Sequence, residues 1–225
     1  MTSQSRALLF DLDGVLSDTQ TLHAEVESVV LAQHGITIEP EEISRRFSGV
    51  KNEEWFRSLA EEKNQAIDVD QAINDKWAEY LRQLPTRAGA VYGGRELLIA
   101  GAKHGWRIGV VSASRHSAVV TVLQLLGVQE LVSIIIGADD VKRGKPDPEG
   151  YLAAARHLNV VPANCIVIED GLAGIHAAKN GGMWSVGLGP HVLQDPGIRP
   201  DIITESLSTV SIDDLAQLIS IHQHP

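Results

Sequence analysis

The stretch Ala7-Leu-Leu-Phe-Asp-Leu-Asp-Gly14 decides how the rest of the chain is interpreted. Residues 7–10 are all apolar and predict a short strand that is buried on both faces, because no polar residue alternates with them. Asp11 and Asp13 follow directly, so their carboxylates emerge at the carboxyl end of that strand. Charge at the edge of an apolar core needs a cation or hydrogen-bond donors beside it. The stretch therefore predicts either a divalent-metal site or a strand that ends in an Asx turn with Gly14.

Apolar runs of the same kind recur along the chain and alternate with segments whose apolar residues fall at helical spacing. The further strands are expected at residues 108–111, 133–136, 165–168 and 184–188. The helices between them are expected at residues 94–103, 115–126, 149–158 and 173–180. Residues 201–204 and 212–221 predict a last short strand and a closing helix. This order predicts an α/β core with a doubly wound, Rossmann-like parallel sheet, in which ligands bind beyond the carboxyl ends of the strands.

The segment between the first and second strands does not follow this alternation and is expected to be purely helical. Its helices are expected at residues 19–34, 41–46, 52–63 and 69–84. The breaks between and after them are Gly35, Ser48-Gly49 and Pro85. We therefore expect an inserted all-helical cap domain at residues 18–88 and a core domain built from residues 1–17 and 89–225. Ser17, Asp18 and the segment 85–89 are the expected hinges.

The composition of the 225-residue chain limits the classes of function. A formal net charge of -10 would repel a polyanionic backbone, which argues against nucleic acid as a partner. The only cysteine, Cys165, excludes an internal disulfide framework and a zinc site built from several cysteines. The polar residues 1–6 precede too short an apolar run for a signal peptide or a membrane span. We expect a cytoplasmic protein that does not bind membranes. We also expect the protein to be a monomer or a weak homodimer.

A second acidic motif repeats the design of the first. The apolar residues 166–168 lead into Glu169, Asp170 and Gly171, where a helix is expected to begin. Acids at the ends of neighbouring strands suit an oxygen-rich, octahedral magnesium site that water and a substrate phosphate would complete. Taken alone, Asp170 is also a common helix N-cap.

The remaining motifs point to an anion. Ser112 ends an expected strand, and its hydroxyl and the neighbouring backbone N–H groups either bind an anion or cap the next helix. The segment 142–148, Lys-Arg-Gly-Lys-Pro-Asp-Pro, concentrates cations in an otherwise acidic chain. It either faces an anion or is a solvated basic turn, and its glycine spacing does not match a Walker loop.

In this order, each at the end of an expected strand, these motifs resemble those of the haloacid dehalogenase superfamily, whose members are mostly phosphatases. The resemblance covers essentially the whole chain, including a helical cap inserted after the first motif. It implies that Asp11 is the nucleophile that forms an aspartyl-phosphate, and that Asp13 protonates the leaving oxygen and then activates the acceptor. The groups implied to hold Mg²⁺ are Asp11, the backbone carbonyl of Asp13, Asp170 and the nearby Glu169. The residues implied to bind the phosphoryl oxygens are Ser112, Ala113 and Lys145.

Within the superfamily the chain is most similar to the branch of sugar-phosphate phosphatases and β-phosphoglucomutases. In the mutases a histidine on the first cap helix is thought to gate the general acid, and His23 lies at the matching position, although a lone histidine on such a helix is commonly structural. The mutases also carry a cap-loop arginine that binds a second phosphate, and in this chain the matching position is Asn52. Because an amide cannot replace a bidentate guanidinium, this difference favours a phosphatase. The residues expected to contact the substrate are Thr19, His23, Lys51, Asn52, Ser114 and Arg115, with His116 as a further candidate.

The resemblance therefore predicts a magnesium-dependent phosphatase that hydrolyses a small phosphomonoester, a sugar or sugar-acid phosphate, through an aspartyl-phosphate. One alternative is a mutase of the β-phosphoglucomutase type, in which a sugar hydroxyl rather than water accepts the phosphoryl group. Another is a noncatalytic protein that binds metal and phosphate. Dehalogenation is set aside, because the dehalogenases lack the second aspartate that Asp13 provides.

Overall fold

The computed structural model describes residues 5–47, 49–193 and 197–221. Its core is a six-stranded sheet in the order β5-β4-β1-β6-β7-β8. Each neighbouring pair of strands is parallel, which confirms the predicted α/β sheet. The strands are β1 (Ala7–Phe10), β4 (Arg107–Val111), β5 (Ile134–Ile136), β6 (Cys165–Glu169), β7 (Trp184–Leu188) and β8 (Ile202–Thr204).

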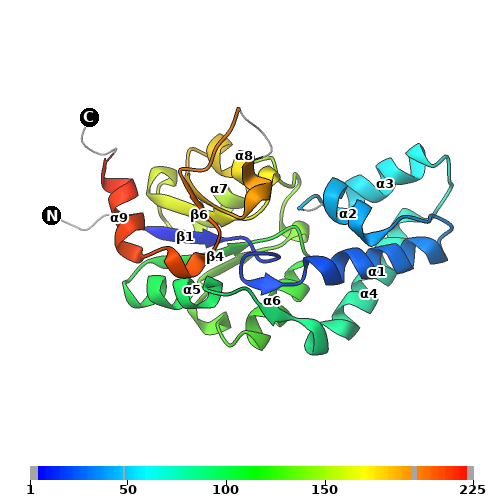
Figure 1. The fold of residues 1–225 in the computed structure, drawn as a ribbon, viewed down its shortest axis with the longest axis horizontal. Coiled ribbons are helices and arrows are strands. Elements are labelled where there is room, and N and C mark those ends of the chain that lie inside the picture. The colour runs from blue at the N-terminus through cyan, green and yellow to red at the C-terminus, as the bar shows by residue number, and fades with distance from the viewer. Residues whose placement is uncertain (1–4, 48, 194–196, 222–225) are drawn as a thin grey trace.

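Helices cover both faces of this sheet (Figure 1). Leu8 and Phe10 of β1 pack in one hydrophobic cluster with α5 (Gly94–Lys103), α6 (His116–Leu125) and α9 (Ile212–Ile221). Ala7 and Leu9 point the other way and pack with α7 (Glu149–His157) and α8 (Leu172–Asn180). A strand buried on both faces needs apolar residues at every position, which is why residues 7–10 show no polar alternation. Among the described residues, no helix is both long and apolar enough to cross a bilayer.

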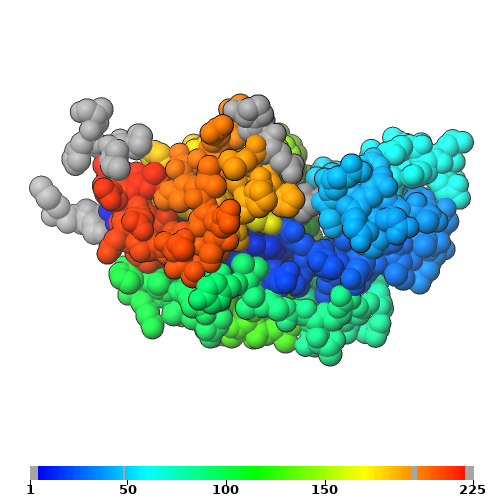
Figure 2. All heavy atoms as spheres, in the orientation of Figure 1, coloured from blue at the N-terminus to red at the C-terminus, as the bar shows by residue number. Residues whose placement is uncertain are grey.

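The cap is a bundle of four helices inserted between β1 and β4. They are α1 (Gln20–Gln33), α2 (Pro40–Phe47), α3 (Asn52–Glu62) and α4 (Val69–Arg87). At the junction with the core, β2 (Ser17–Asp18) and β3 (Gly89–Ala90) form a short antiparallel pair. Figure 2 shows the blue and cyan atoms of the cap as a lobe at one end of the molecule, beside the core. The predicted all-helical cap is confirmed.

One helix boundary in the cap was predicted wrongly. We expected the last cap helix to end at Leu84 before Pro85, but α4 continues through the proline to Arg87. Proline has no backbone N–H, so the helix loses the one hydrogen bond that residue 85 would donate. Because Pro85 lies in the last turn, the loss stays local, and Ala88 N–H again donates to Leu84 O at 2.9 Å.

Some parts of the expected organisation cannot be compared with the structure. Ser48 of the expected break, and residues 1–4, 194–196 and 222–225 of the expected core, lie outside the described residues. Short 3₁₀ helices complete the core: η1 (Gln129–Leu131), η2 (Ala138–Asp140), η3 (Pro162–Asn164), η4 (Pro190–Leu193) and η5 (Leu207–Thr209).

Candidate active site

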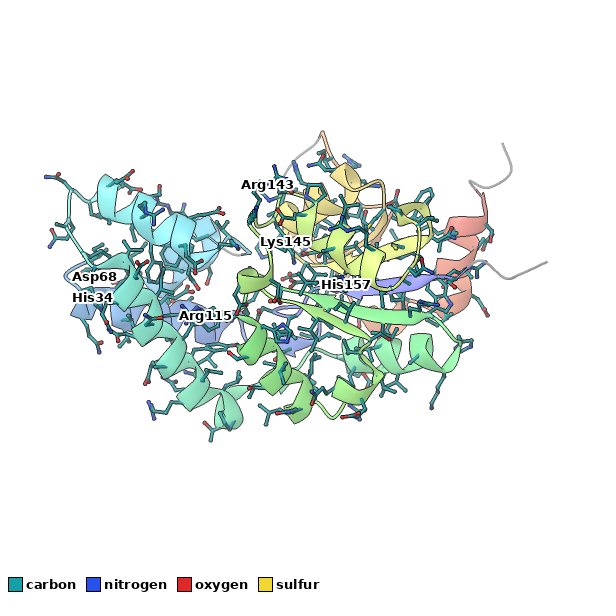
Figure 3. All side chains as sticks on the ribbon, turned by 180° about the vertical axis from the view of Figure 1, so that it is seen from behind. His34, Asp68, Arg115, Arg143, Lys145 and His157 are labelled. Atoms are coloured by element: carbon teal, nitrogen blue, oxygen red, sulfur yellow. The ribbon has the colours of Figure 1, made fainter. Side chains whose placement is uncertain are left out.

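Neighbouring strands bring the sequence motifs together at one edge of the sheet. β1 lies between β4 and β6, parallel to both. Asp11 follows β1, Ser112 follows β4 and Glu169 ends β6. The loop before α7 adds Lys145, which Figure 3 labels on the side of the core that faces the cap. The motifs converge because the carboxyl ends of parallel strands lie at the same edge of a sheet.

The acidic residues of the two strand ends form a cluster that fits a metal ion. Asp11, Glu169 and Asp170 each offer a carboxylate oxygen, and these oxygens lie within 4.8 Å of one another. Burial raises the pKa of Asp11 well above its usual value, although Lys145 opposes this. Burial and the charge of Glu169 raise the pKa of Asp170 to about 7. The ammonium group of Lys145 therefore does not balance the three carboxylates, and an oxygen-only donor set of this kind suits Mg²⁺.

The side chain of Gln20 gives an independent test of that fit. Its amide nitrogen donates to Asp170 Oδ2 and to the backbone carbonyl of Asp13 at 3.3 Å, so a partly positive group lies against two of the oxygens implied to hold the metal. Gly14 adopts a φ of +89°, and a Cβ there would lie 2.2 Å from Asp170 Oδ2. The turn can therefore bring the carbonyl and the carboxylate together only with glycine at this position.

Lys145 is the cation buried within the cluster. Its Nζ contacts Asp11 Oδ1 and lies 2.6 Å from Glu169 Oε1, which also accepts a hydrogen bond from Tyr151 Oη at 2.8 Å. Burial alone would lower the pKa of Lys145, but the two carboxylates outweigh it and raise the pKa well above its usual value. Lys145 therefore stays charged and can neutralise an anion that approaches Asp11.

Asp13 is held as a carboxylate by hydrogen bonds. Its Oδ1 accepts from Thr19 Oγ1 and lies 3.2 Å from His23 Nε2, while its Oδ2 accepts from Ser114 Oγ at 2.9 Å and from Ser112 Oγ at 3.3 Å. Burial favours the neutral acid, but the interaction with His23 and the hydrogen bonds from Thr19 and Ser114 lower the pKa of Asp13 well below its usual value. In this arrangement Asp13 is ready to accept a proton.

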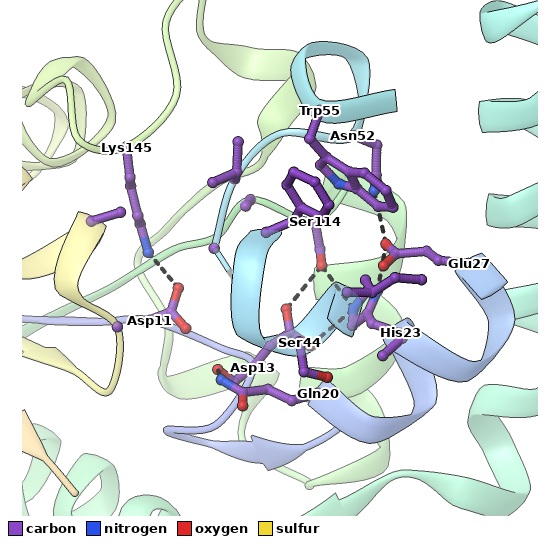
Figure 4. A pocket seen from close by; sticks show the side chains of 18 of the residues that line it. Asp11, Asp13, Gln20, His23, Glu27, Ser44, Asn52, Trp55, Ser114 and Lys145 are labelled. Carbon is purple, nitrogen blue, oxygen red and sulfur yellow. Dashed lines mark hydrogen bonds and ion pairs between the residues drawn. The ribbon is translucent and has the colours of Figure 1, made fainter. Parts of the chain in front are cut away.

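One pocket between core and cap collects most of the predicted site residues (Figure 4). Those lining it are Asp11, Asp13, His23, Asn52, Ala113, Ser114, Lys145, Glu169 and Asp170. Thr19 and Ser112 lie behind this surface, buried, and reach the pocket through their hydrogen bonds to Asp13. The structure therefore brings together the predicted nucleophile, the predicted acid–base residue and the predicted metal and phosphate ligands.

Two predicted substrate residues do not reach this pocket. Lys51 Nζ instead donates to the backbone carbonyl of Val141 in the core, at 2.8 Å. Arg115 donates to Asn74 Oδ1 in the cap at 3.1 Å, and Figure 3 labels it where core and cap meet. Both side chains bridge the cap and the core in this arrangement, and their expected contact with the substrate stays a prediction. The further candidate His116 is partly exposed and pairs with Asp140.

Several residues of the pocket were missed by the sequence interpretation. They are Gln20, Glu27, Trp55, Lys76 and Trp77. Glu27 lies four positions after His23 on α1, so both fall on one face of that helix, and this spacing was a usable signal. Lys76 gave no such signal, because only the packing of α4 against α1 buries it.

Comparison with known proteins gives the family. The model of the haloacid dehalogenase-like hydrolases matches residues 8–188. Validoxylamine A 7'-phosphate phosphatase from Streptomyces hygroscopicus subsp. limoneus is 34% identical over 206 residues, which cover 91% of this chain and 95% of that protein. β-Phosphoglucomutase from Bacillus subtilis is 29% identical over 215 residues, which cover 92% of each chain.

The solved structures agree with the sequence comparison. A crystal structure of β-phosphoglucomutase from Clostridium difficile matches with a TM-score of 0.86 at 26% identity and covers 98% of this chain and 99% of that one. The shared architecture includes both the parallel sheet and the inserted helical cap. Because the family match spans residues 8–188, well over half of the sequence, the chain belongs to the haloacid dehalogenase-like hydrolases, as a phosphatase of that family.

Proposed function

We propose that this phosphatase uses Mg²⁺ and an aspartyl-phosphate on Asp11 to hydrolyse a small phosphomonoester, a sugar or sugar-acid phosphate. The observation that carries the proposal is the convergence of Asp11, Asp13 and Lys145 in one pocket beside the acidic cluster. The relatives support the substrate class, since one is a phosphatase of validoxylamine A 7'-phosphate and another a β-phosphoglucomutase.

The residues of the pocket divide the reaction into two steps. In the first, Asp13 takes the proton of the phosphomonoester monoanion. An oxygen of Asp11 then bonds to phosphorus, the bond from phosphorus to the leaving oxygen breaks, and Asp13 passes that proton to the leaving oxygen. In the second, water attacks phosphorus, Asp13 takes the proton of the water, and the bond to Asp11 breaks to release inorganic phosphate. Lys145 and Ser112, with the backbone at Ala113, bind the phosphoryl oxygens throughout.

The acidic cluster is the binding site that we propose for the Mg²⁺ cofactor. Asp11, Glu169, Asp170 and the carbonyl of Asp13 would hold Mg²⁺, which when bound offsets the negative charge of the phosphoryl group and of the carboxylates. Phosphoryl transfer depends on such neutralisation and on alignment more than on elaborate covalent chemistry.

The cap supplies the enclosure that the intermediate needs. We assign the cap to residues 18–88 and the core to residues 1–17 and 89–225, with hinges at Ser17, Asp18 and the segment 85–89. The contact of His23 with Asp13 ties the position of the acid–base residue to that of the cap. A closed cap excludes bulk water while the phosphoryl group is transferred.

A phosphosugar mutase is the second candidate. The high structural similarity to β-phosphoglucomutase and the pairing of His23 with Asp13 favour it. Asn52 disfavours it, because its amide lies at the position of the mutase arginine and hydrogen-bonds within the cap to Glu27 and Lys76.

Phosphate release tests the proposal. It is measured with and without Mg²⁺ across hexose, pentose, polyol and aldonate phosphates, for the wild type, Asp11→Asn and the control Asp70→Asn, which changes an exposed carboxylate of the cap. We expect magnesium-dependent release that Asp11→Asn abolishes and Asp70→Asn retains. Isomerisation of β-glucose 1-phosphate without net release would establish the mutase. Absence of both activities would refute the proposed function.

A further inference from the structure

The cap side of the pocket contains a buried polar cluster that the proposed mechanism does not use. Glu27 of α1, Asn52 of α3 and Lys76 of α4 all line the pocket, and they are 6%, 6% and 1% exposed. They come from three different helices, so packing of the cap is what brings them together. Charged side chains this deeply buried are rare unless they are paired, and these are paired with one another.

Lys76 is fully engaged within the cap. Its Nζ lies 3.0 Å from Asn52 Oδ1, 3.0 Å from His23 Nδ1 and 3.4 Å from Glu27 Oε1. These three contacts use the three N–H donors of an ammonium group, and the group also lies 3.3 Å from the centre of the Trp77 ring. Lys76 therefore has neither a spare donor nor an unbalanced charge to offer a ligand.

Glu27 is engaged through one of its two oxygens. Asn52 Nδ2 donates to Oε1 at 2.8 Å, and the contacts with Lys76 and His23 reach the same oxygen. No hydrogen bond from a described residue to Oε2 is present, so this oxygen can accept one from a ligand. A carboxylate oxygen accepts hydrogen bonds and repels anions.

The charges of the residues that line the whole pocket also disfavour a second anionic group on the substrate. Among the described residues that line it, the carboxylates are Asp11, Asp13, Glu27, Glu169 and Asp170, and the ammonium groups are Lys76 and Lys145. Lys145 is committed to the phosphoryl site and Lys76 to Glu27. A second anionic group on a substrate would therefore enter a low-dielectric pocket without a cation to meet it.

From these contacts we infer that Glu27 determines the specificity of the leaving group. The substrate carries one phosphate as its only anion, and it presents a hydrogen-bond donor, a hydroxyl or an ammonium, to Glu27. The aromatic residues Phe47, Trp55 and Trp77 line the same pocket and provide an apolar surface for the carbon skeleton. Within the proposed function, on which this inference rests, the geometry points to neutral or amine-bearing sugar phosphates rather than sugar-acid phosphates or bisphosphates.

Binding to a variant that cannot turn over tests this inference separately from catalysis. In the Asp11→Asn background with Mg²⁺, calorimetry compares glucose 6-phosphate, glucosamine 6-phosphate, 6-phosphogluconate and fructose 1,6-bisphosphate, with Glu27 intact and as Glu27→Gln. The measurement is made below pH 7, where Lys76 is protonated. We expect the ligands with one anionic group to bind more tightly while Glu27 is intact. Glu27→Gln should shift the Kd ratio about tenfold or more toward the ligands with two anionic groups, because it leaves Lys76 unbalanced.

Control variants separate charge from shape. Glu27→Asp keeps the charge and should keep the preference for ligands with one anion. Glu25→Gln removes a partly exposed carboxylate of the same helix that pairs with Arg87, and it should change no Kd ratio. A preference for glucosamine 6-phosphate over glucose 6-phosphate would show that Glu27 recognises an ammonium, whereas equal binding of the two would indicate a hydroxyl.

The outcomes distinguish failure of the inference from failure of the proposed function. The inference is overturned if Asp11→Asn with Glu27 intact binds the bisphosphate or the sugar acid more tightly, a result that does not depend on whether Glu27→Gln folds. It is also overturned if Glu27→Gln folds but leaves the Kd ratio unchanged. Loss of all phosphate release by the wild type, with the binding preference retained, would instead refute only the proposed function.

Discussion

Replacing Lys145 with methionine tests the electrostatics of the site most directly. The substitution keeps an unbranched side chain, one atom shorter, but removes the only ammonium in contact with Asp11 and Glu169 among the described residues. Breaking a buried ion pair from one side costs about 3–5 kcal/mol, because the partner charges stay buried without compensation. For a domain of this size, each kcal/mol lowers Tm by about 2–4 °C, so we expect a loss of roughly 6–20 °C.

The assay is thermal unfolding in EDTA at neutral pH, followed by a titration with Mg²⁺. Added Mg²⁺ should restore part of the lost stability, because it supplies positive charge to the same carboxylates. Phosphate release should fall by about a hundredfold or more even with saturating Mg²⁺, since a cation at the phosphoryl oxygens is lost. The control Lys103→Met, at an exposed position of α5, should stay within about 0.5 kcal/mol of the wild type. A Tm for Lys145→Met within about 2 °C of the wild type would refute the reasoning that the ammonium group of Lys145 compensates the buried carboxylates of Asp11 and Glu169.

Three further predictions concern the cap and the metal cluster. Burial lowers the pKa of Lys76 from 10.5 to about 8. The folded protein therefore binds fewer protons there than the unfolded chain, so the wild type should gain on the order of 3 kcal/mol relative to Lys76→Met between about pH 8 and 10.5. A pH-independent difference in urea unfolding would contradict this. Gly174→Ala would place a Cβ 1.7 Å from Glu169 Oε1 and should cost about 1–3 kcal/mol in the same assay, whereas a loss below about 0.5 kcal/mol would show that the glutamate can move. Lys51→Met removes the hydrogen bond to Val141 O that joins cap and core, and should raise KM up to about fivefold; an unchanged KM would show that this contact does not stabilise the closed cap.

The parts of the site that the sequence predicted are those built from local patterns. Asp11, Ser112 and Glu169 could be placed because each lies at the end of a continuous apolar run, and parallel strands carry such residues to one edge. The same patterns predicted the helical cap, because helical spacing is also a short-range signal. The error at Pro85 arose because a proline in the last turn of a helix removes only one hydrogen bond, which the packing of α4 outweighs.

The sequence by itself determined the strands of the core sheet, the cap helices and the order of the site motifs, since each depends on residues that are neighbours in the chain. Only the tertiary structure decided that Glu27, Asn52 and Lys76 meet, because three separate helices must pack before their side chains touch. It also decided that Lys51 turns toward Val141 and away from the pocket. A long flexible side chain has many directions available, and only the surface packed against it selects one.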